Sequence, residues 1–142
     1  MGALIDGDVF RRLCLSREFA RDAHAGTVNL TAMARVAGMS PFHFARSFRR
    51  AFGQTPHAWL TDVRLQRAKV LLARSGTHVT DVCFDVGFSS LGSFSTLFAR
   101  HVGVPPSAWQ RQMVRLAQSP GGIAVAFVPH CFATRFCSLG VG

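Results

Sequence analysis

Acidic residues and lysine are both scarce in this sequence of 142 residues. Seven Asp and Glu stand against sixteen Lys and Arg, which gives a formal net charge of +9, and fifteen of those sixteen residues are arginine. This excess of positive charge predicts a polyanionic partner. The planar guanidinium suits bidentate contacts with phosphate and guanine, although genome base composition also produces such a bias. Nucleic acid fits better than an acidic membrane, because no basic block accompanies a long lipid-facing stripe.

The sequence also lacks an apolar run long enough to span a bilayer, and no signal peptide follows Met1. Four cysteines, at positions 14, 83, 131 and 137, have irregular spacings that indicate the reducing cytoplasm. We therefore expect a cytoplasmic protein without a membrane partner. No paired carboxylates, phosphate-binding loop or Ser/His/Asp set is evident, so we expect neither an enzyme nor a cofactor.

An internal repeat organises the chain. Residues 44–59 align with residues 94–109 at an offset of 50, and the stretch just upstream aligns at an offset of 49. Seven pairs are identical in the first alignment: Phe44/Phe94, Phe48/Phe98, Arg50/Arg100, Gly53/Gly103, Pro56/Pro106, Ala58/Ala108 and Trp59/Trp109. Each copy has the pattern of a short helix, a glycine turn and a longer helix. The repeat therefore predicts two helix-turn-helix units in tandem.

Local signals mark the turn in each copy. In the first copy, Gly38 suits the left-handed residue that closes a helix, and Ser40 with Pro41 suits the start of the next one. In the second copy, Gly87 marks the break, and Ser89 or Ser90 is the expected cap. The turns therefore fall at matching positions of the repeat.

A long helix is expected to join the two units. Thr55 and Pro56 begin it, and apolar residues continue to about residue 75, which makes it about 20 residues or about 30 Å long. Successive major grooves on one face of B-DNA lie about 34 Å apart, so this helix suits two units placed one duplex turn apart. We expect an all-α chain of about seven helices, opened by a scaffold helix over residues 9–25. The expected parts are a first unit (1–55), a linker helix (56–75), a second unit (76–112) and a short apolar tail of unknown role (113–142).

The first longer helix, residues 41–52, carries the strongest candidate contacts with DNA bases. Its apolar side holds Phe44 and Phe48, which we expect to be buried. The opposite side holds the candidate base-contacting residues Phe42, Ala45, Arg46 and Arg49. Arg46 suits a bidentate contact with guanine, and Phe42 and Ala45 suit thymine methyl groups. The alternative for Arg46 is a plain solvated arginine.

The second longer helix, residues 90–102, is chemically poorer on its outward side. Its candidate base-contacting residues are Gly92, Ser95 and Thr96. None of these side chains can hold guanine by two hydrogen bonds, so we expect weak readout there, or readout through DNA shape. The candidate phosphate contacts of both units are Thr31, His43, Arg50, Arg100 and Arg111. His43 is about as well explained as a partly buried packing residue.

Two stretches resemble a known family. They are VTDVCFDVGFSSLGSFSTLFARHVGVPPSAWQR over residues 79–111 and MSPFHFARSFRRAFGQTPHAWL over residues 39–60, the latter followed by RLQRAKVLL. With the rest of residues 10–112, they resemble the DNA-binding domain of the AraC/XylS family of transcription regulators. The matching positions of the first stretch are Asp85, Gly87, Phe88, Ser89, Phe94, Phe98, Gly103, Pro106 and Trp109. Leu91, Ser93 and Thr96 depart from the Gln, His and Arg that are common near these positions in the family.

The resemblance implies a bacterial, nucleoid-associated regulator that binds double-stranded promoter DNA. Both longer helices would enter adjacent major grooves of an asymmetric site. The resemblance also implies contact with RNA polymerase, as in an activator, and a monomer or weak dimer. Because no sensing domain of well over a hundred residues fits, the chain resembles the short, stand-alone members.

Two other functions stay open. The first is a nucleic-acid-binding protein of the nucleoid type without sequence preference, although the aromatic residues follow core spacing rather than the exposed stacking pattern of RNA platforms. The second is cysteine-based alkyl-group repair, which some relatives combine with this domain. Repair needs a cysteine-rich zinc module ahead of the repeat, where only Cys14 is present.

The tail suggests no firm function. Residues 123–128 suit a strand or a loose, aggregation-prone segment. His130, Cys131 and Cys137 invite a metal site, but their C-x5-C spacing is not a usual zinc pattern. We expect no metal.

Overall fold

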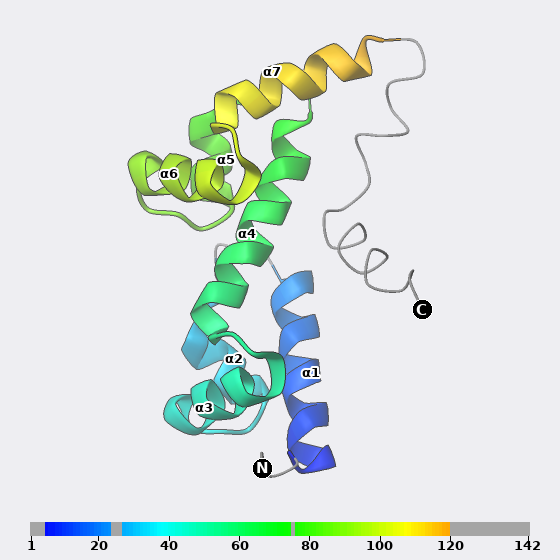
Figure 1. Cartoon of the computed structure of the whole chain (residues 1–142). Coiled ribbons are helices and arrows are strands. Elements are labelled where there is room, and N and C mark those ends of the chain that lie inside the picture. Colours follow the sequence, from blue (N-terminus) through cyan, green and yellow to red (C-terminus); the bar gives the residue numbers. More distant parts are fainter. Residues whose placement is uncertain (1–4, 24–26, 75, 120–142) are drawn as a thin grey trace.

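The computed structural model describes residues 5–23, 27–74 and 76–119, and these residues form seven helices and no strand (Figure 1). The helices are α1 (Gly7–Asp22), α2 (Leu30–Val36), α3 (Pro41–Phe52), α4 (Pro56–Leu72), α5 (Val79–Asp85), α6 (Leu91–Val102) and α7 (Pro106–Ala117). Helix α4 lies between a lower group, α1 to α3, and an upper group, α5 to α7 (Figure 1). The prediction of an all-α chain with about seven helices is confirmed.

The repeat appears in the helix lengths and in their ends. Helices α2 and α5 have seven residues each, and α3 and α6 have twelve each. The Ser40 hydroxyl accepts a hydrogen bond from the His43 amide at 3.3 Å. In the second copy, Ser90 rather than Ser89 is the cap, and its hydroxyl accepts from the Ser93 amide at 3.3 Å. Each cap satisfies one of the free amides at the start of its helix.

The two helix-turn-helix turns have the same backbone geometry. Gly38 has φ 62° and Gly87 has φ 93°, which are left-handed values that side chains with a Cβ rarely adopt. In the first turn, the Gly38 amide donates to the Arg35 carbonyl and the Met39 amide to the Ala34 carbonyl, both at 2.9 Å. The second turn repeats this pair of bonds around Gly87. Both are Schellman motifs, so the glycines are required by the turn itself.

Helix α4 contributes to two separate hydrophobic cores. Trp59 and Leu60 belong to the first core, which is centred on Phe44 and Phe48. Leu65, Ala68 and Leu72 belong to the second, which is centred on Phe94 and Phe98. At about 100° per residue, these two sets lie about half a turn apart around the helix axis. One continuous helix therefore fixes each unit by a different part of its surface.

Helix α1 contributes core residues to the first unit at the same positions at which the second half of α4 contributes them to the second unit. The fully buried positions of α1 are Leu13, Ser16 and Ala20, and those of α4 at an offset of 52 are Leu65, Ala68 and Leu72. Beside them, Arg17 lies 5.3 Å from the Trp59 ring centroid and Lys69 lies 5.0 Å from that of Trp109. The structural repeat is thus longer than the sequence repeat: the first copy begins with α1 and the second with the second half of α4. The first half of α4 ends the first copy, so α4 belongs to both copies.

The helix bounds differ slightly from the expected ones. Helix α4 has 17 residues, or about 26 Å at the helical rise, because its last core residue is Leu72. Helix α7 continues to Ala117, so residues 113–117 are helical rather than part of a tail, and Met113 and Val114 are half-buried there. The expected strand at residues 123–128 and the metal candidates His130, Cys131 and Cys137 lie outside the described residues.

Candidate nucleic-acid interface

The outward side of α3 combines an exposed aromatic ring with exposed cations. Phe44 and Phe48 are fully buried on one side of the helix, whereas Phe42 on the other side is 73% exposed. Arg46 and Arg49 are exposed beside it, and Ala45 is half-buried. The Arg46 guanidinium carbon lies 5.5 Å from the Phe42 ring centroid, within cation–π range. This side of the helix offers a planar donor next to an apolar ring, as contacts with guanine and a thymine methyl require.

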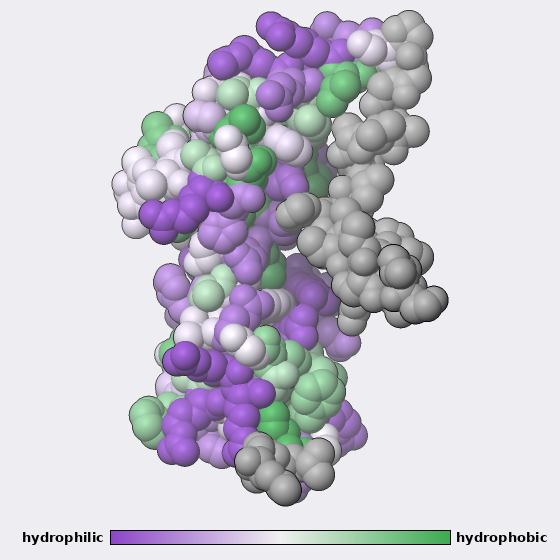
Figure 2. Space-filling model, in the orientation of Figure 1, coloured by the Kyte–Doolittle hydropathy of each residue, from purple (hydrophilic) through white to green (hydrophobic). Residues whose placement is uncertain are grey.

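The outward side of α6 occupies the same positions with small, uncharged residues. Gly92 and Thr96 are exposed and Ser95 is half-buried. A Cβ built on Gly92 would meet only the Ser90 hydroxyl, at 3.7 Å, so the surface there is open. Figure 2 shows strongly hydrophilic residues over α3 and a mostly pale surface over α6. The side chains of α6 therefore offer hydroxyl groups and close approach, but no paired donor for guanine.

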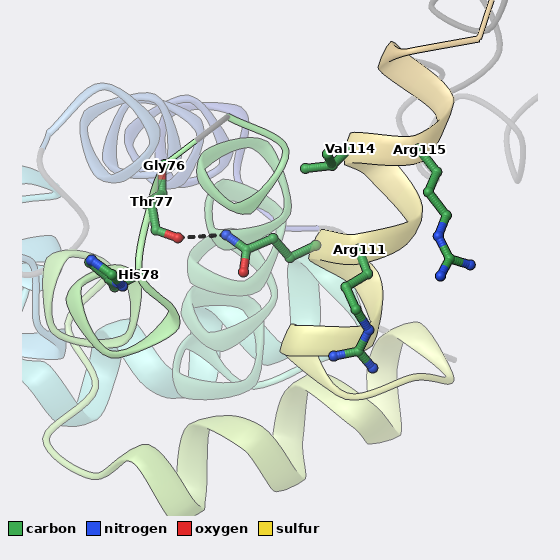
Figure 3. A pocket seen from close by; sticks show the side chains of 7 residues that line it. Gly76, Thr77, His78, Arg111, Val114 and Arg115 are labelled. Carbon is green, nitrogen blue, oxygen red and sulfur yellow. Dashed lines mark hydrogen bonds between the residues drawn. The ribbon is translucent and has the colours of Figure 1, made fainter.

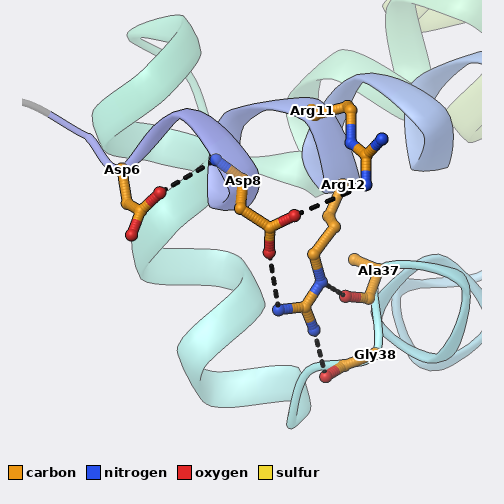
Figure 4. Close-up of polar contacts among 6 residues, drawn as sticks. All are labelled: Asp6, Asp8, Arg11, Arg12, Ala37 and Gly38. Carbon is orange, nitrogen blue, oxygen red and sulfur yellow. Dashed lines mark hydrogen bonds and ion pairs between the residues drawn. The ribbon is translucent and has the colours of Figure 1, made fainter.

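An arginine on α1 holds the first turn in place. The Arg12 Nε donates to the Ala37 carbonyl at 2.7 Å, and its terminal nitrogen donates to the Gly38 carbonyl at 2.6 Å (Figure 4). Asp8 lies 3.7 Å from the same guanidinium. Ser16 adds a buried hydrogen bond from its hydroxyl to the Met33 carbonyl at 2.8 Å. Helix α1 is thus bonded to the end of α2 and to the turn that sets the direction of α3.

We expect Arg12→Ala to lower the free energy of unfolding by about 1–2 kcal/mol, because the half-buried bond to the Ala37 carbonyl and the exposed bond to the Gly38 carbonyl both lose their charged donor. Urea denaturation followed by circular dichroism would measure this change. Arg11→Ala is the matched control, since the Arg11 side chain is 75% exposed and contacts only Asp8, at 3.5 Å, among the bonds described. Equal effects of the two substitutions would contradict this role for Arg12.

In each copy of the repeat, the carbonyl just ahead of the short helix accepts a hydrogen bond from the helix that follows the longer one. Arg64 on α4 donates to the Val28 carbonyl at 2.9 Å, and Gln110 on α7 donates to the Thr77 carbonyl at 2.5 Å. Val28 and Thr77 are 49 residues apart, so they are matching positions of the repeat. Burial lowers the pKa of Arg64 below its usual very high value. Each short helix is therefore held at its start, and in α2 this is next to the candidate phosphate-contacting residue Thr31.

Comparison with known proteins identifies the family. A family model described as a helix-turn-helix domain, of the AraC/XylS type, matches residues 33–112. The chain belongs to the AraC/XylS family of transcription regulators. It is 37% identical over 94 residues, 66% of its own length and 32% of the other's, to the RCS-specific HTH-type transcriptional activator RclR of Escherichia coli K12. The family resemblance inferred from the sequence is confirmed.

Solved structures of AraC-type domains share this fold. An AraC-type regulator from Chromobacterium violaceum matches with a TM-score of 0.68 and 21% identity, covering 78% of this chain and 98% of the other. The DNA-binding domain of AdpA, solved in complex with a target DNA, matches with a TM-score of 0.68 and 28% identity, covering 76% and 98%. These relatives are transcription regulators rather than enzymes. The chain spans about a third of the length of the curated AraC-family relatives that it matches.

The AraC-type fold brings the two candidate base-contacting surfaces to comparable positions. Helices α3 and α6 lie on the same side of α4, one near each end, in Figure 1. The candidate phosphate-contacting residues Thr31, His43, Arg50, Arg100 and Arg111 are all exposed. Arg111 lies apart from the others, on α7, in a shallow groove with Gly76, Thr77 and His78 (Figure 3). Its contact with a phosphate stays a prediction, as do the roles of the other site residues.

The described residues of this AraC-family chain contain neither a grouped set of metal ligands nor a membrane-spanning helix. Within the described ranges, no group of three or more His, Cys, Asp or Glu side chains is placed to hold a metal ion. No helix of the same residues is both long and apolar enough to cross a bilayer. Cys83 is fully buried, and this burial raises the pKa of its thiol. It therefore packs as a small apolar residue between the helices of the second unit.

Sequence reasoning missed the residues that position the site. Arg12, Ser16 and Arg64 bond to carbonyls that are 17 to 36 residues away in the chain. The one available signal was the spacing of Leu13, Ser16 and Ala20, which recurs at an offset of 52 in α4.

Proposed function

We propose that this chain is a sequence-specific regulator of transcription that binds double-stranded promoter DNA with α3 and α6 in adjacent major grooves. One observation carries the proposal. Two helices of twelve residues, with nearly the same order of buried and exposed positions, are presented near the two ends of one straight connecting helix. An isolated helix-turn-helix unit has one such surface, whereas this chain has two.

Helix α3 is the main determinant of sequence preference in this proposal. Arg46 donates two hydrogen bonds to guanine, Phe42 and Ala45 lie against thymine methyl groups, and Arg49 reaches a neighbouring base. Helix α6 approaches the groove closely through Gly92, Ser95 and Thr96 and contributes less discrimination. Thr31, His43, Arg50, Arg100 and Arg111 contact phosphates and set the register.

The dimensions of α4 support the placement in adjacent grooves. Its length of about 26 Å, together with the width of the units at its ends, is on the scale of one duplex turn of about 34 Å. The relative AdpA was solved with its DNA-binding domain on a target DNA. Because RclR is named a transcriptional activator, the proposal extends to contact with RNA polymerase in the bacterial cytoplasm, by a monomer or weak dimer.

Selection of binding sites from a random pool of duplex DNA would test the proposed function. We expect a bipartite motif whose halves lie about 10 base pairs apart, with more information in the half that contacts α3. Specific DNA should compete about a thousandfold better than bulk DNA at physiological salt.

The competing function is non-specific binding of the nucleoid type, which the net charge of +9 and the uncharged residues Gly92, Ser95 and Thr96 on the outward side of α6 favour. Tight binding without an enriched motif would establish this alternative. A motif with a single half would instead show that α6 does not discriminate between bases.

A further inference from the structure

The C-terminal turn of α6 is joined to α4 by a histidine. The His101 Nε2 atom lies 2.9 Å from an oxygen of the Asp62 carboxylate. Its Nδ1 atom lies 3.0 Å from the Leu97 carbonyl oxygen, one turn back on α6. Both side chains are partly exposed, at 39% and 43%. The ring is therefore held between two oxygens, and one of these belongs to the helix that connects the units.

Both neighbours of the imidazole are acceptors, so the two contacts together need two N–H groups on the ring. A carbonyl and a carboxylate donate no proton, so each bond requires an N–H on the facing ring nitrogen. Neutral imidazole carries one N–H and can make only one of the two bonds. Imidazolium carries two, makes both, and adds a charge opposite the Asp62 carboxylate. The observed arrangement is therefore complete only in the protonated form.

Asp62 is the charged partner of the His101 ring. Within the described part of the chain, it is the carboxylate at ion-pair distance from His101. The remaining charged residues on α6 and the helices packed around it are Arg100 on α6, Arg64, Arg67 and Lys69 on α4, Asp81 and Asp85 on α5, and Arg111 and Arg115 on α7. Six of these eight residues are cations, and Asp81 and Asp85 are the two carboxylates.

The first unit has an apolar contact at the corresponding place. At the offsets of the structural repeat, Asp62 corresponds to Phe10 and His101 to Ala51. Phe10 contacts Phe52, the residue after Ala51, with 5.8 Å between ring centroids. Two aromatic rings do not titrate near neutral pH. The contact of α3 with α1 at this place thus has no titratable group, whereas the contact of α6 with α4 has two.

We propose that His101 is a positioning residue that locks α6 onto α4 in its protonated form, so that the second unit holds DNA more tightly as pH falls through the range in which imidazole titrates. The proposal rests on the proposed function for its effect on DNA, but the lock itself is a property of the free protein. Lower pH strengthens the attachment of α6 to α4, and the attachment of α3 to α1 stays constant.

The lock is tested in the full chain without DNA by a double-mutant cycle. His101→Gln, Asp62→Asn and the double variant are compared with the wild type by urea unfolding at about pH 6 and about pH 8. We expect the His101–Asp62 coupling to change the unfolding equilibrium constant about two- to fivefold at the lower pH, and markedly less at the higher pH. A coupling that is absent, or equal at both pH values, overturns the proposal.

The effect on DNA is tested with two probes, the selected site and the same site with its α6 half scrambled. The ratio of the two affinities should fall about two- to fivefold between about pH 6 and about pH 8 in the wild type, and stay constant in His101→Gln. His57→Gln is the matched control, because His57 is exposed on α4 and has no assigned contact with DNA, so its loss should leave the pH dependence of the ratio intact. The same pH dependence in His101→Gln overturns the proposal. If the wild type shows no preference for the selected site at any pH, the proposed function fails, while the cycle still decides whether the lock exists.

Discussion

Replacing Arg46 with alanine is expected to weaken binding to the selected DNA site by about fivefold to more than a hundredfold, or about 1–3 kcal/mol. The guanidinium is exposed on α3 beside Phe42, and no other side chain on the outward side of that helix offers the same position for a paired donor. Affinity for unrelated DNA should change far less, because a lost base contact affects discrimination more than phosphate attraction. Fluorescence anisotropy with specific and bulk DNA at one fixed salt concentration would measure both effects.

Two variants control this experiment. Arg46→Lys keeps the charge but loses the planar fork, so specific affinity should stay low while bulk affinity recovers. Thr96→Ala, at the matching position of α6, should cost less than about threefold, because a single hydroxyl contributes one hydrogen bond. If Arg46→Ala left site selectivity intact while Thr96→Ala abolished it, the assignment of the main contact to α3 would be wrong.

Replacing Phe98 with alanine is expected to lower the free energy of unfolding by about 3–5 kcal/mol. Phe98 is fully buried, and its ring centroid lies 5.6 Å from that of Phe94 and 6.5 Å from that of Trp109. Its removal leaves a cavity between α4, α6 and α7 that rigid helices cannot fill. The loss is a large part of the total stability of a domain, typically about 5–15 kcal/mol. Urea denaturation followed by circular dichroism would measure it.

Phe42→Ala is the matched control for Phe98→Ala, because the same atoms are removed from a side chain that is 73% exposed. Its effect on unfolding should stay within about 0.5 kcal/mol. Its effect on DNA binding should be larger than that of a neutral surface substitution, since Phe42 is a candidate contact with thymine. Comparable destabilisation by the two substitutions would contradict the division of α3 and α6 into a buried and an outward side.

The two units differ in chemistry more than in shape. The buried positions of α3 and α6 match, whereas their outward residues differ in charge and size. The ends of these helices also attach differently, through the Phe10–Phe52 contact in one unit and the His101–Asp62 pair in the other. Under the two proposals, α3 discriminates between bases and the attachment of α6 responds to protons.

The helices and their ends were predictable from the sequence because their causes are local. Caps such as Ser40, glycines such as Gly38 and the spacing of Phe44 and Phe48 act within a few residues of one another. The repeat then identified the second copy of each feature. The outward residues followed from the same periodicity, since residues opposite a buried stripe must face solvent.

Three features depended on tertiary structure. The sequence left Ser89 and Ser90 as equal candidates for a cap, and only the path of the turn placed the Ser90 hydroxyl at the Ser93 amide. The correspondence between α1 and the second half of α4 was not predicted from the sequence, because matching core positions such as Ser16 and Ala68 are both buried but hold different residue types. The end of α4 at Leu72 was set by the edge of the second core.

By itself, the sequence determined seven helices, two matching units and the residues on their outward sides, because helix formation and amphipathic periodicity depend on near neighbours. Only the tertiary structure decided which distant groups hold those units in position. Arg12 reaches a carbonyl 25 residues away and His101 reaches a carboxylate on another helix. Such pairs follow from how the helices pack against one another, and no local pattern of residues encodes that packing.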